Sequence, residues 1–273
     1  DNEGEINGTI KLIFQPAEEG GAGGKMMRDQ GVLKDPDVER IFGLHVSDKL
    51  PTGTLASKEG TLLAATSSIK ILVSGNGGHA AMPHLTVDPV VTGSKIVVEL
   101  QTLVSRELDP LESGVISITM ANAGSATNVI PSSMELQGTI RSLTSDGITR
   151  LQQRVREVAE AIAMANRCIA EVTFPGNDFP PTVNDGECWE LGRISAGEIL
   201  GEECVSEMGS IMGGEDFSYY TQVIPGCFSF LGVGNPEIGA VYGVHHPKFK
   251  VDEDALSLGT AIHVNTAFKA LAG

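Results

Sequence analysis

The spacing of apolar residues along the chain changes between the period of a strand and the period of a helix. Short apolar runs predict strands at residues 8–14, 40–46, 53–57, 67–74, 114–121, 134–141, 169–174 and 227–233. Longer amphipathic or helix-prone segments predict helices at residues 25–30, 87–108, 145–166, 187–200 and 252–272. Gly31 is the expected C-cap of the first helix, and Ser145 is the expected N-cap of the third.

The order of these elements predicts an α/β fold in which one domain interrupts another. Residues 1–66 and 183–273 carry alternating strands and helices, which predicts a split α/β domain with a mostly parallel sheet. Residues 67–182 follow the order β-α-β-β-α-β, which is typical of a ferredoxin-like α+β unit. We therefore expect the second domain to be an insertion in the first.

The charge and composition of the chain argue against some classes of binding partner. The chain has 273 residues with 19 basic and 35 acidic side chains, for a net charge of −16. Such a surface repels phosphate backbones and anionic lipids, and no apolar run reaches the length of a membrane span. We expect no nucleic acid and no membrane as partners.

The spacing of the cysteines is a guide to the cellular compartment of the protein. Cys168, Cys188, Cys204 and Cys227 are widely scattered and form no CxxC pair. This spacing favours reduced thiols and a cytoplasmic location.

Two adjacent carboxylates, Glu18 and Glu19, follow the first predicted strand between Pro16 and Gly20. Ligand sites in open α/β sheets gather at the carboxyl ends of strands. Neighbouring residues on extended backbone point in different directions, so one carboxylate can bind a metal while the other faces the water on that metal. The alternative is that the pair begins a helix, where acidic residues complement the helix dipole.

Histidines follow two later segments and are candidates for the same site. His45 ends the next predicted strand, in the sequence GLH, and His245 and His246 lie in YGVHHPKF. Imidazole and carboxylate together suit zinc, manganese or cobalt better than calcium or magnesium. Two adjacent histidines cannot easily share one ion, so we expect one of them to be a ligand. The alternatives are a structural hydrogen bond for His45 and an exposed turn for the pair.

Six motifs, taken together and in order, resemble those of the M20 metallopeptidase family. They are QPAEEGGAGG, FGLHV, GGHAAMPH, NVIPSSMELQGTIR, GGEDFSYY and HHPKF. The branch they resemble contains aminoacylases and hippurate-hydrolase-like amidohydrolases, among them the plant auxin-conjugate hydrolases. The resemblance extends over essentially the whole chain.

The resemblance implies roles for the residues of the split domain. Glu18 matches the general base that activates the metal-bound water, and Glu19, His45 and His245 match metal ligands. The intact family binds two divalent ions per site, and zinc, manganese and cobalt all accept these ligands. Glu215 and Asp216 in GGEDFS either line the cleft or cap the helix that follows.

The resemblance also implies roles for three residues of the inserted domain. His79 matches the histidine that stabilises the oxyanion, a role that the family typically exercises across a dimer. Asn128 and Arg141 match residues that hold the substrate, Arg141 through the substrate carboxylate. From the residues alone, each could equally be structural: a tight turn at His79, a turn before Pro131 at Asn128, and an exposed strand end at Arg141.

The implied function is metal-dependent hydrolysis of the amide bond of an N-acyl amino acid or a related conjugate. The expected substrate is a small-molecule N-acyl amino acid. The inserted domain is expected to act as a lid and to supply the contacts of a homodimer. Two alternatives remain: a non-catalytic dimerisation or binding module, and a dipeptidase of the same family.

One departure from the family pattern limits these expectations. The family carries an upstream motif close to CGHD that supplies a cysteine and a histidine ligand, and this chain has no such motif. We therefore expect the chain to lack the N-terminal part of the catalytic domain. Three ligands can hold a single zinc ion, so the enzymatic activity is expected of the intact protein.

Overall fold

The computed structural model describes residues 7–176 and 178–272, which form two compact units. The first unit contains residues 7–63, 182–211 and 215–272. The second contains residues 64–176, 178–181 and 212–214. Among the helices of the described residues, none is both long and apolar enough to cross a bilayer.

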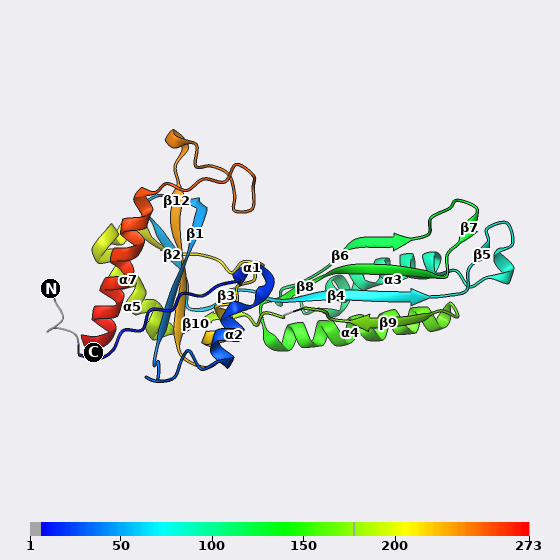
Figure 1. Cartoon of the computed structure of the whole chain (residues 1–273), viewed down its shortest axis with the longest axis horizontal. Coiled ribbons are helices and arrows are strands. Elements are labelled where there is room, and N and C mark those ends of the chain that lie inside the picture. Colours follow the sequence, from blue (N-terminus) through cyan, green and yellow to red (C-terminus); the bar gives the residue numbers. More distant parts are fainter. Residues whose placement is uncertain (1–6, 177, 273) are drawn as a thin grey trace. The chain divides into compact units, whose positions relative to one another are not determined.

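The first unit is built on a four-stranded sheet in the order β1-β12-β2-β11 (Figure 1). These strands are β1 (Ile41–Pro51), β12 (Gly226–Gly234), β2 (Leu55–Ser57) and β11 (Val205–Glu207). Two of the three pairings are parallel, β1 with β12 and β2 with β11, while β12 and β2 are antiparallel. The expected mostly parallel sheet is confirmed. A separate antiparallel pair joins β3 (Gly60–Leu63) to β10 (Thr182–Asn184).

Helices cover both faces of this sheet because β12 is apolar on both sides. Cys227, Leu231 and Val233 pack with α5 (Gly186–Leu200) and α7 (Asp254–Ala272). Phe228 and Phe230 belong to a second cluster with Phe217 and Tyr220, next to α6 (Ser218–Thr221). A strand buried on both faces is typical of a parallel sheet between helices. The short helices α1 (Glu18–Gly21) and α2 (Gly23–Asp29) precede the sheet in the chain, and two 3-10 turns (Glu202–Cys204 and Pro236–Ile238) lie in its connections.

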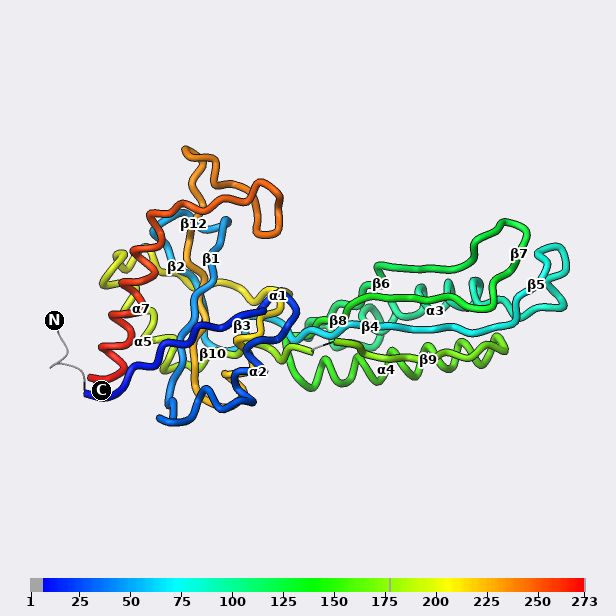
Figure 2. Tube along the Cα trace, viewed as in Figure 1, coloured from blue at the N-terminus to red at the C-terminus, as the bar shows by residue number. Residues whose placement is uncertain are grey.

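The predicted strand at residues 8–14 is wrong. No ladder among the described residues includes this segment, and its side chains at Ile10, Leu12 and Phe14 are exposed, Phe14 by 85%. Alternation of apolar residues gives a strand only where a neighbouring strand exchanges hydrogen bonds with it. Figure 2 shows the segment as an extended trace that begins near the end of α7, where Gly8 lies against Leu271.

The second unit is the expected ferredoxin-like unit. Its sheet has the order β6-β8-β4-β9 with every pairing antiparallel. The strands are β4 (Ala65–Ser74), β6 (Gly114–Ala123), β8 (Ser133–Ser142) and β9 (Ile169–Thr173). The helices are α3 (Pro89–Thr102), which continues as a π-helical turn at Leu103–Glu107, and α4 (Ser145–Ala165).

The core of the second unit follows from alternation in its strands. Ile69, Ile71 and Val73 of β4 are buried, and they belong to one cluster with Val155 and Ala159 of α4. The expected N-cap of α4 is wrong by one residue: Thr144, in an extended conformation, accepts a hydrogen bond from the Gly147 N–H at 3.0 Å. An N-cap must lie outside the helix to do this, and Ser145 already belongs to the first turn.

A small two-stranded pair extends the second unit. It joins β5 (Gly78–His79) to β7 (Val129–Ile130), with His79 opposite Val129. A 3-10 turn at Pro83–Leu85 follows β5.

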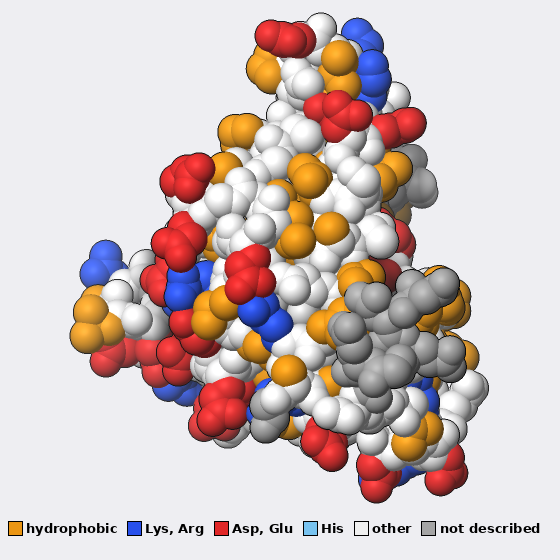
Figure 3. All heavy atoms as spheres, turned by 90° about the vertical axis from the view of Figure 1, so that its left-hand side faces the viewer, with side chains coloured by type: hydrophobic (Ala, Val, Ile, Leu, Met, Phe, Trp, Pro, Cys, Tyr) orange, Lys and Arg blue, Asp and Glu red, His pale blue; other side chains and the backbone are white. Residues whose placement is uncertain are grey.

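On the face of the molecule in Figure 3, acidic side chains are spread out rather than gathered in one place. Figure 3 shows Asp and Glu side chains at many points of the viewed face, with Lys and Arg side chains beside only some of them. This distribution fits the net charge of −16 and offers no basic stripe on that face for a phosphate backbone.

Candidate active site

The acidic pair lies on a tight, irregular turn of the first unit. Ala17, Gly20 and Ala22 all have positive φ angles of 60°, 123° and 49°. The single helical turn of α1 therefore does not continue into α2. Glu18 is half-buried and Glu19 is exposed. The pair begins the short helix α1, as in the alternative interpretation, rather than lying on extended backbone. The two carboxylates nevertheless have different neighbours.

Glu19 approaches His245, which is far from it in the sequence. The distance from His245 Nδ1 to Glu19 Oε2 is 4.0 Å, and both side chains are largely exposed, by 71% and 78%. His245 has a φ of 69°, a conformation uncommon for residues other than glycine. Two potential metal ligands that are far apart in the sequence thus come within reach of one ion. The predicted third ligand, His45, does not join them: among the described residues, the group of three possible ligands within 4.8 Å of one another is Glu18, Glu215 and Asp216.

His246 has a different environment from its neighbour. Its ring stacks on Tyr242 with centroids 4.5 Å apart, and its Nδ1 accepts a hydrogen bond from the Lys248 N–H at 3.0 Å. These contacts place His246 within its own loop. Of the two adjacent histidines, only His245 is recorded beside the acidic pair.

His45 lies in β1, next to Phe230 of β12, with ring centroids 5.7 Å apart. Its Nδ1 is 2.7 Å from the Val46 carbonyl oxygen. Because a carbonyl oxygen only accepts, Nδ1 must carry the proton, which leaves Nε2 of the neutral ring with a lone pair for a ligand. This arrangement is the one usual for metal-binding histidines.

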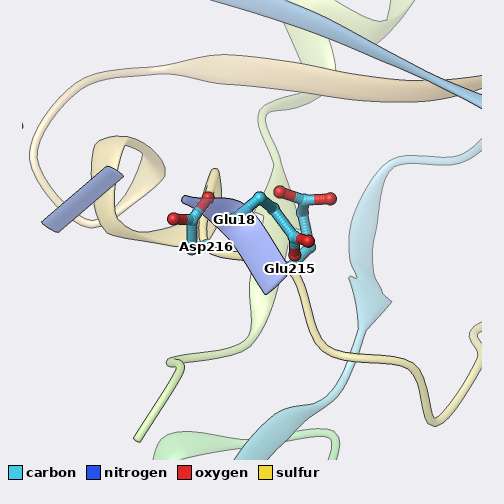
Figure 4. A group of neighbouring side chains, drawn as sticks. All are labelled: Glu18, Glu215 and Asp216. Atoms are coloured by element: carbon cyan, nitrogen blue, oxygen red, sulfur yellow. The ribbon is translucent and has the colours of Figure 1, made fainter. Parts of the chain in front are cut away.

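Glu18 forms a group with two carboxylates from the GGEDF segment (Figure 4). Oxygen atoms of Glu18, Glu215 and Asp216 all lie within 4.8 Å of one another. Burial is the main cause that raises the pKa of Glu18, and the charges of Asp216 and Glu19 add to it. The ring of His45 and a hydrogen bond from the Asp216 backbone act in the opposite direction. Glu18 is therefore a carboxyl group held partly away from water.

Glu215 and Asp216 are more deeply buried than Glu18. Glu215 is 6% exposed, and burial raises its pKa to about 7. Its Oε1 accepts the Phe217 N–H at 3.1 Å, a bond that lies before α6, and α6 itself has no side-chain cap. Asp216 is fully buried, and its carboxylate binds residues on either side of the acidic pair. Oδ1 accepts a hydrogen bond from Gln15 Nε2 at 2.6 Å, and Oδ2 accepts one from the Gly24 N–H at 2.8 Å.

Sequence reasoning missed Gln15 and left the role of Asp216 open. Gln15 stands directly before Pro16 in the motif that carries the acidic pair, and this position was the only available signal. A contact between residues so distant in the sequence has no local pattern.

The second unit brings together two of its three candidate residues. His79 in β5 is exposed, and the Ala80 N–H donates to the Asn128 carbonyl oxygen at 3.0 Å, so His79 and Asn128 lie on adjacent segments. Arg141 lies near the other end of β8, opposite Thr66 and Val115. At a rise of ~3.3 Å per residue, it is about 26 Å along the strand from Ser133, where β8 begins.

The environment of Arg141 is partly apolar. Burial lowers the pKa of its guanidinium group, and its Nη1 donates to the Ile140 carbonyl oxygen at 3.0 Å. A half-buried guanidinium with unused donors is suited to bind a carboxylate.

Comparison with known proteins identifies the family. The model for peptidase family M20/M25/M40 matches residues 1–269. The chain belongs to peptidase family M20/M25/M40. An IAA-amino acid hydrolase ILR1-like 2 from Arabidopsis thaliana is 45% identical over 269 residues, which cover 97% of this chain and 60% of that protein. Thermostable carboxypeptidase 1 from Saccharolobus solfataricus is 38% identical over 271 residues, covering 98% of this chain and 67% of that protein.

A solved M20 structure has the same fold. It is the Bacillus subtilis YXEP protein, described as a dinuclear metal binding peptidase, with a TM-score of 0.81 and 31% identity. The match covers 98% of this chain and 67% of that one. The chain thus spans about 60% of the length of the Arabidopsis M20 relative and about two thirds of the other two.

The raised pKa of Glu215 predicts a pH-dependent stability for this M20 chain without metal. Between pH 4.5, the ordinary value, and about 7, the folded state binds this proton more tightly than the unfolded state does. Stability therefore falls as the pH rises through this window, by up to about 3 kcal/mol. Glu215→Gln should flatten the curve and raise the free energy of unfolding at pH 8 by a similar amount. Urea denaturation in EDTA across this range measures both.

The control for this experiment is Glu203→Gln, which changes an exposed carboxylate of the same unit. Its stability curve should run parallel to that of the wild type. Parallel curves for wild type and Glu215→Gln would show that Glu215 does not titrate in this window.

Proposed function

We propose that the intact protein is a metal-dependent amidohydrolase that cleaves an N-acyl amino acid, or a related amide conjugate, into a carboxylic acid and an amino acid. The observation that carries the proposal is the approach of Glu19 and His245 to 4.0 Å on the unit that also holds the partly desolvated Glu18. The name of the Arabidopsis relative, an IAA-amino acid hydrolase, supports the reaction class.

Glu19, His45 and His245 would hold a divalent ion in this proposal. The donor types fit, because they offer a carboxylate oxygen and two imidazole nitrogens, and the His45 proton is fixed on Nδ1 by the Val46 carbonyl. Only Glu19 and His245 approach each other in the structure, so binding of the ion would have to draw His45 to them. Zinc, manganese and cobalt all accept these ligands. When bound, such an ion polarises the amide carbonyl and lowers the pKa of water. Two ions per site are proposed for the intact protein, as the description of YXEP states for that relative.

Glu18 would act as the general base. It would take a proton from the attacking water and deliver it to the leaving nitrogen. Both transfers require a carboxyl group whose pKa is shifted towards neutrality. Burial of Glu18 and the nearby charge of Asp216 shift its pKa in that direction.

The second unit would supply the remaining functions. We propose His79 as the donor to the oxyanion, Asn128 as a residue that holds the substrate, and Arg141 as the partner of its carboxylate. Residues 67–182 would form a lid and dimerisation domain, and residues 1–66 and 183–273 the catalytic domain. His79 lies in the separate β5–β7 pair, which is joined to the start of β8, whereas Arg141 lies near the other end of β8. One copy of this unit therefore cannot bring both to a small substrate, which supports a homodimer.

A cytoplasmic location is part of the proposal. All four cysteines are free thiols, and Cys168, Cys188 and Cys227 are buried. The acidic surface also supports a small molecule, rather than nucleic acid or a membrane, as the partner.

Two alternatives make different predictions. A dipeptidase is favoured by the carboxypeptidase name of the Saccharolobus relative. A non-catalytic dimerisation or binding module is the other alternative, and it predicts no turnover and no bound metal.

Matched substrates separate these possibilities. N-acetyl-alanine, glycyl-alanine and N-acetyl-alanine amide share one scissile bond and differ in the acyl group or the terminal charge. With added zinc, manganese or cobalt, release of the amine product should be fastest from N-acetyl-alanine and poor from the neutral amide, which gives Arg141 no carboxylate. Faster cleavage of glycyl-alanine would favour the dipeptidase. Absence of turnover with every metal would favour the binding module.

A further inference from the structure

The turn that carries Glu18 and Glu19 has little internal support. Three of its residues, Ala17, Gly20 and Ala22, have positive φ angles, and two of them are not glycine. Neither Ala17 nor Ala22 provides a side-chain cap for the helix that follows it. Within the turn, the Gly21 and Gly23 N–H groups donate to the Ala17 carbonyl oxygen at 3.0 and 3.4 Å. The strained conformation needs further contacts from outside the turn.

Asp216 supplies contacts on both sides of this turn. Oδ1 accepts a hydrogen bond from Gln15 Nε2 at 2.6 Å, before the acidic pair, and Oδ2 accepts from the Gly24 N–H at 2.8 Å, after it. The Gly24 N–H lies in the first turn of α2, where a helix leaves its N–H groups without intrahelical partners. A single buried carboxylate thus closes the segment from 15 to 24 into a loop.

The backbone of Asp216 makes a third connection. A hydrogen bond from the Asp216 backbone to Glu18 is one of the causes that act on the pKa of Glu18. The same residue therefore contacts the base proposed above and both ends of the turn that carries it.

The packing around this connection is close. A Cβ atom on Gly24 would lie 2.6 Å from the Asp216 carbonyl oxygen and 2.9 Å from Gln15 Oε1. A Cβ atom on Gly23 would collide with the Pro16 carbonyl oxygen. Gly23 lets the turn close on Pro16, and Gly24 lets the turn approach the GGEDF segment closely enough for the Asp216 hydrogen bonds.

We infer that Asp216 is a positioning residue, which fixes the turn carrying Glu18 and Glu19 through its hydrogen bonds to Gln15 and Gly24. Its two carboxylate oxygens already accept short hydrogen bonds, so they are occupied in this role rather than directed at a metal ion. The inference about position stands by itself, and only its consequence for catalysis rests on the proposed function.

Hydrogen exchange of the whole chain tests the inference independently of activity. Asp216→Ala removes both side-chain acceptors, and amide exchange in peptides covering residues 15–26 should become at least ~10-fold faster. Asp216→Asn should exchange at a rate close to that of the wild type. The reason is that the Gln15 amide can turn over: the Asn Oδ1 still accepts from Gly24, and the Asn Nδ2 donates to Gln15 Oε1.

Two further variants distinguish a local effect on this turn from a general loss of structure. Gln15→Ala changes a half-buried side chain and removes one of the two hydrogen bonds, so it should speed exchange in the same peptides by a smaller factor. Glu203→Gln is the control, because it changes an exposed carboxylate of the same unit outside the Glu18, Glu215 and Asp216 group, and exchange over residues 15–26 should not change. Unchanged exchange in both Asp216→Ala and Gln15→Ala would overturn the inference.

Kinetics then test the consequence for catalysis. Under saturating metal, Asp216→Ala should lower kcat by ~10–100-fold with KM within about 2-fold, and Asp216→Asn should recover most of kcat. Loss of bound metal in Asp216→Asn, with exchange still slow, would show that Asp216 is a metal ligand and would overturn its assignment as a positioning residue. If the wild type has no hydrolytic activity, the proposed function fails, while the exchange experiment still decides the inference.

Discussion

Replacing Glu18 with glutamine is expected to lower kcat by ~10²–10⁴-fold, because glutamine has the size of glutamate but cannot take a proton from water. The folded structure should be kept, since the amide oxygen can still accept the hydrogen bond from the Asp216 backbone. KM should change little, because the proton transfer is made only in the transition state. Steady-state kinetics on an N-acyl amino acid measure both parameters.

The metal content of Glu18→Gln separates this role from that of a ligand. It should equal the wild-type content, whereas Glu19→Gln should bind metal more weakly. A Glu18→Gln protein that retains wild-type kcat would remove Glu18 from the mechanism. One that loses its metal would reassign it as a ligand.

The second large effect is expected at the pair of adjacent histidines. His245→Ala should weaken metal binding and activity by more than ~100-fold, since outer-shell partners of metal ligands alone contribute 10–100-fold. His246→Ala is the matched control one residue away, and it should change metal affinity by less than about 10-fold. It removes the stack on Tyr242 and the Lys248 N–H acceptor, which belong to the loop.

Metal titration monitored by calorimetry distinguishes the two histidines. The approach of His245 to Glu19 supports His245 as the metal ligand. A larger loss of metal affinity in His246→Ala than in His245→Ala would instead assign that role to His246. Equal loss in both would indicate that the loop as a whole, rather than one imidazole, is required.

Much of the fold could be predicted from the sequence because the patterns that specify it are local. The apolar run at 227–233 predicts a buried strand, and β12 is buried on both faces. The order of strands and helices between residues 67 and 182 predicts the ferredoxin-like unit. The prediction of a strand at residues 8–14 is wrong. Alternation of apolar residues specifies which side chains share a face, but a strand also needs a neighbouring strand that exchanges hydrogen bonds with it.

The candidate site was predictable only in part. The family motifs identify Glu18, Glu19, His45 and His245, but no periodicity distinguishes His245 from His246. The distinction depends on the stacking of His246 on Tyr242 and on the positive φ of His245. The hydrogen bonds that Asp216 accepts from Gln15 and Gly24 could not be predicted from the sequence either, because they join segments that are close only in the folded chain.

The most direct test of the proposed metal site is a crystal structure of the protein grown with manganese or zinc, with data collected at the absorption edge of that metal. The account predicts an anomalous peak at ~2.0–2.2 Å from a Glu19 carboxylate oxygen, His45 Nε2 and a ring nitrogen of His245. A peak bound instead by Glu215 and Asp216, or the three side chains too far apart to meet at any one ion, would contradict it.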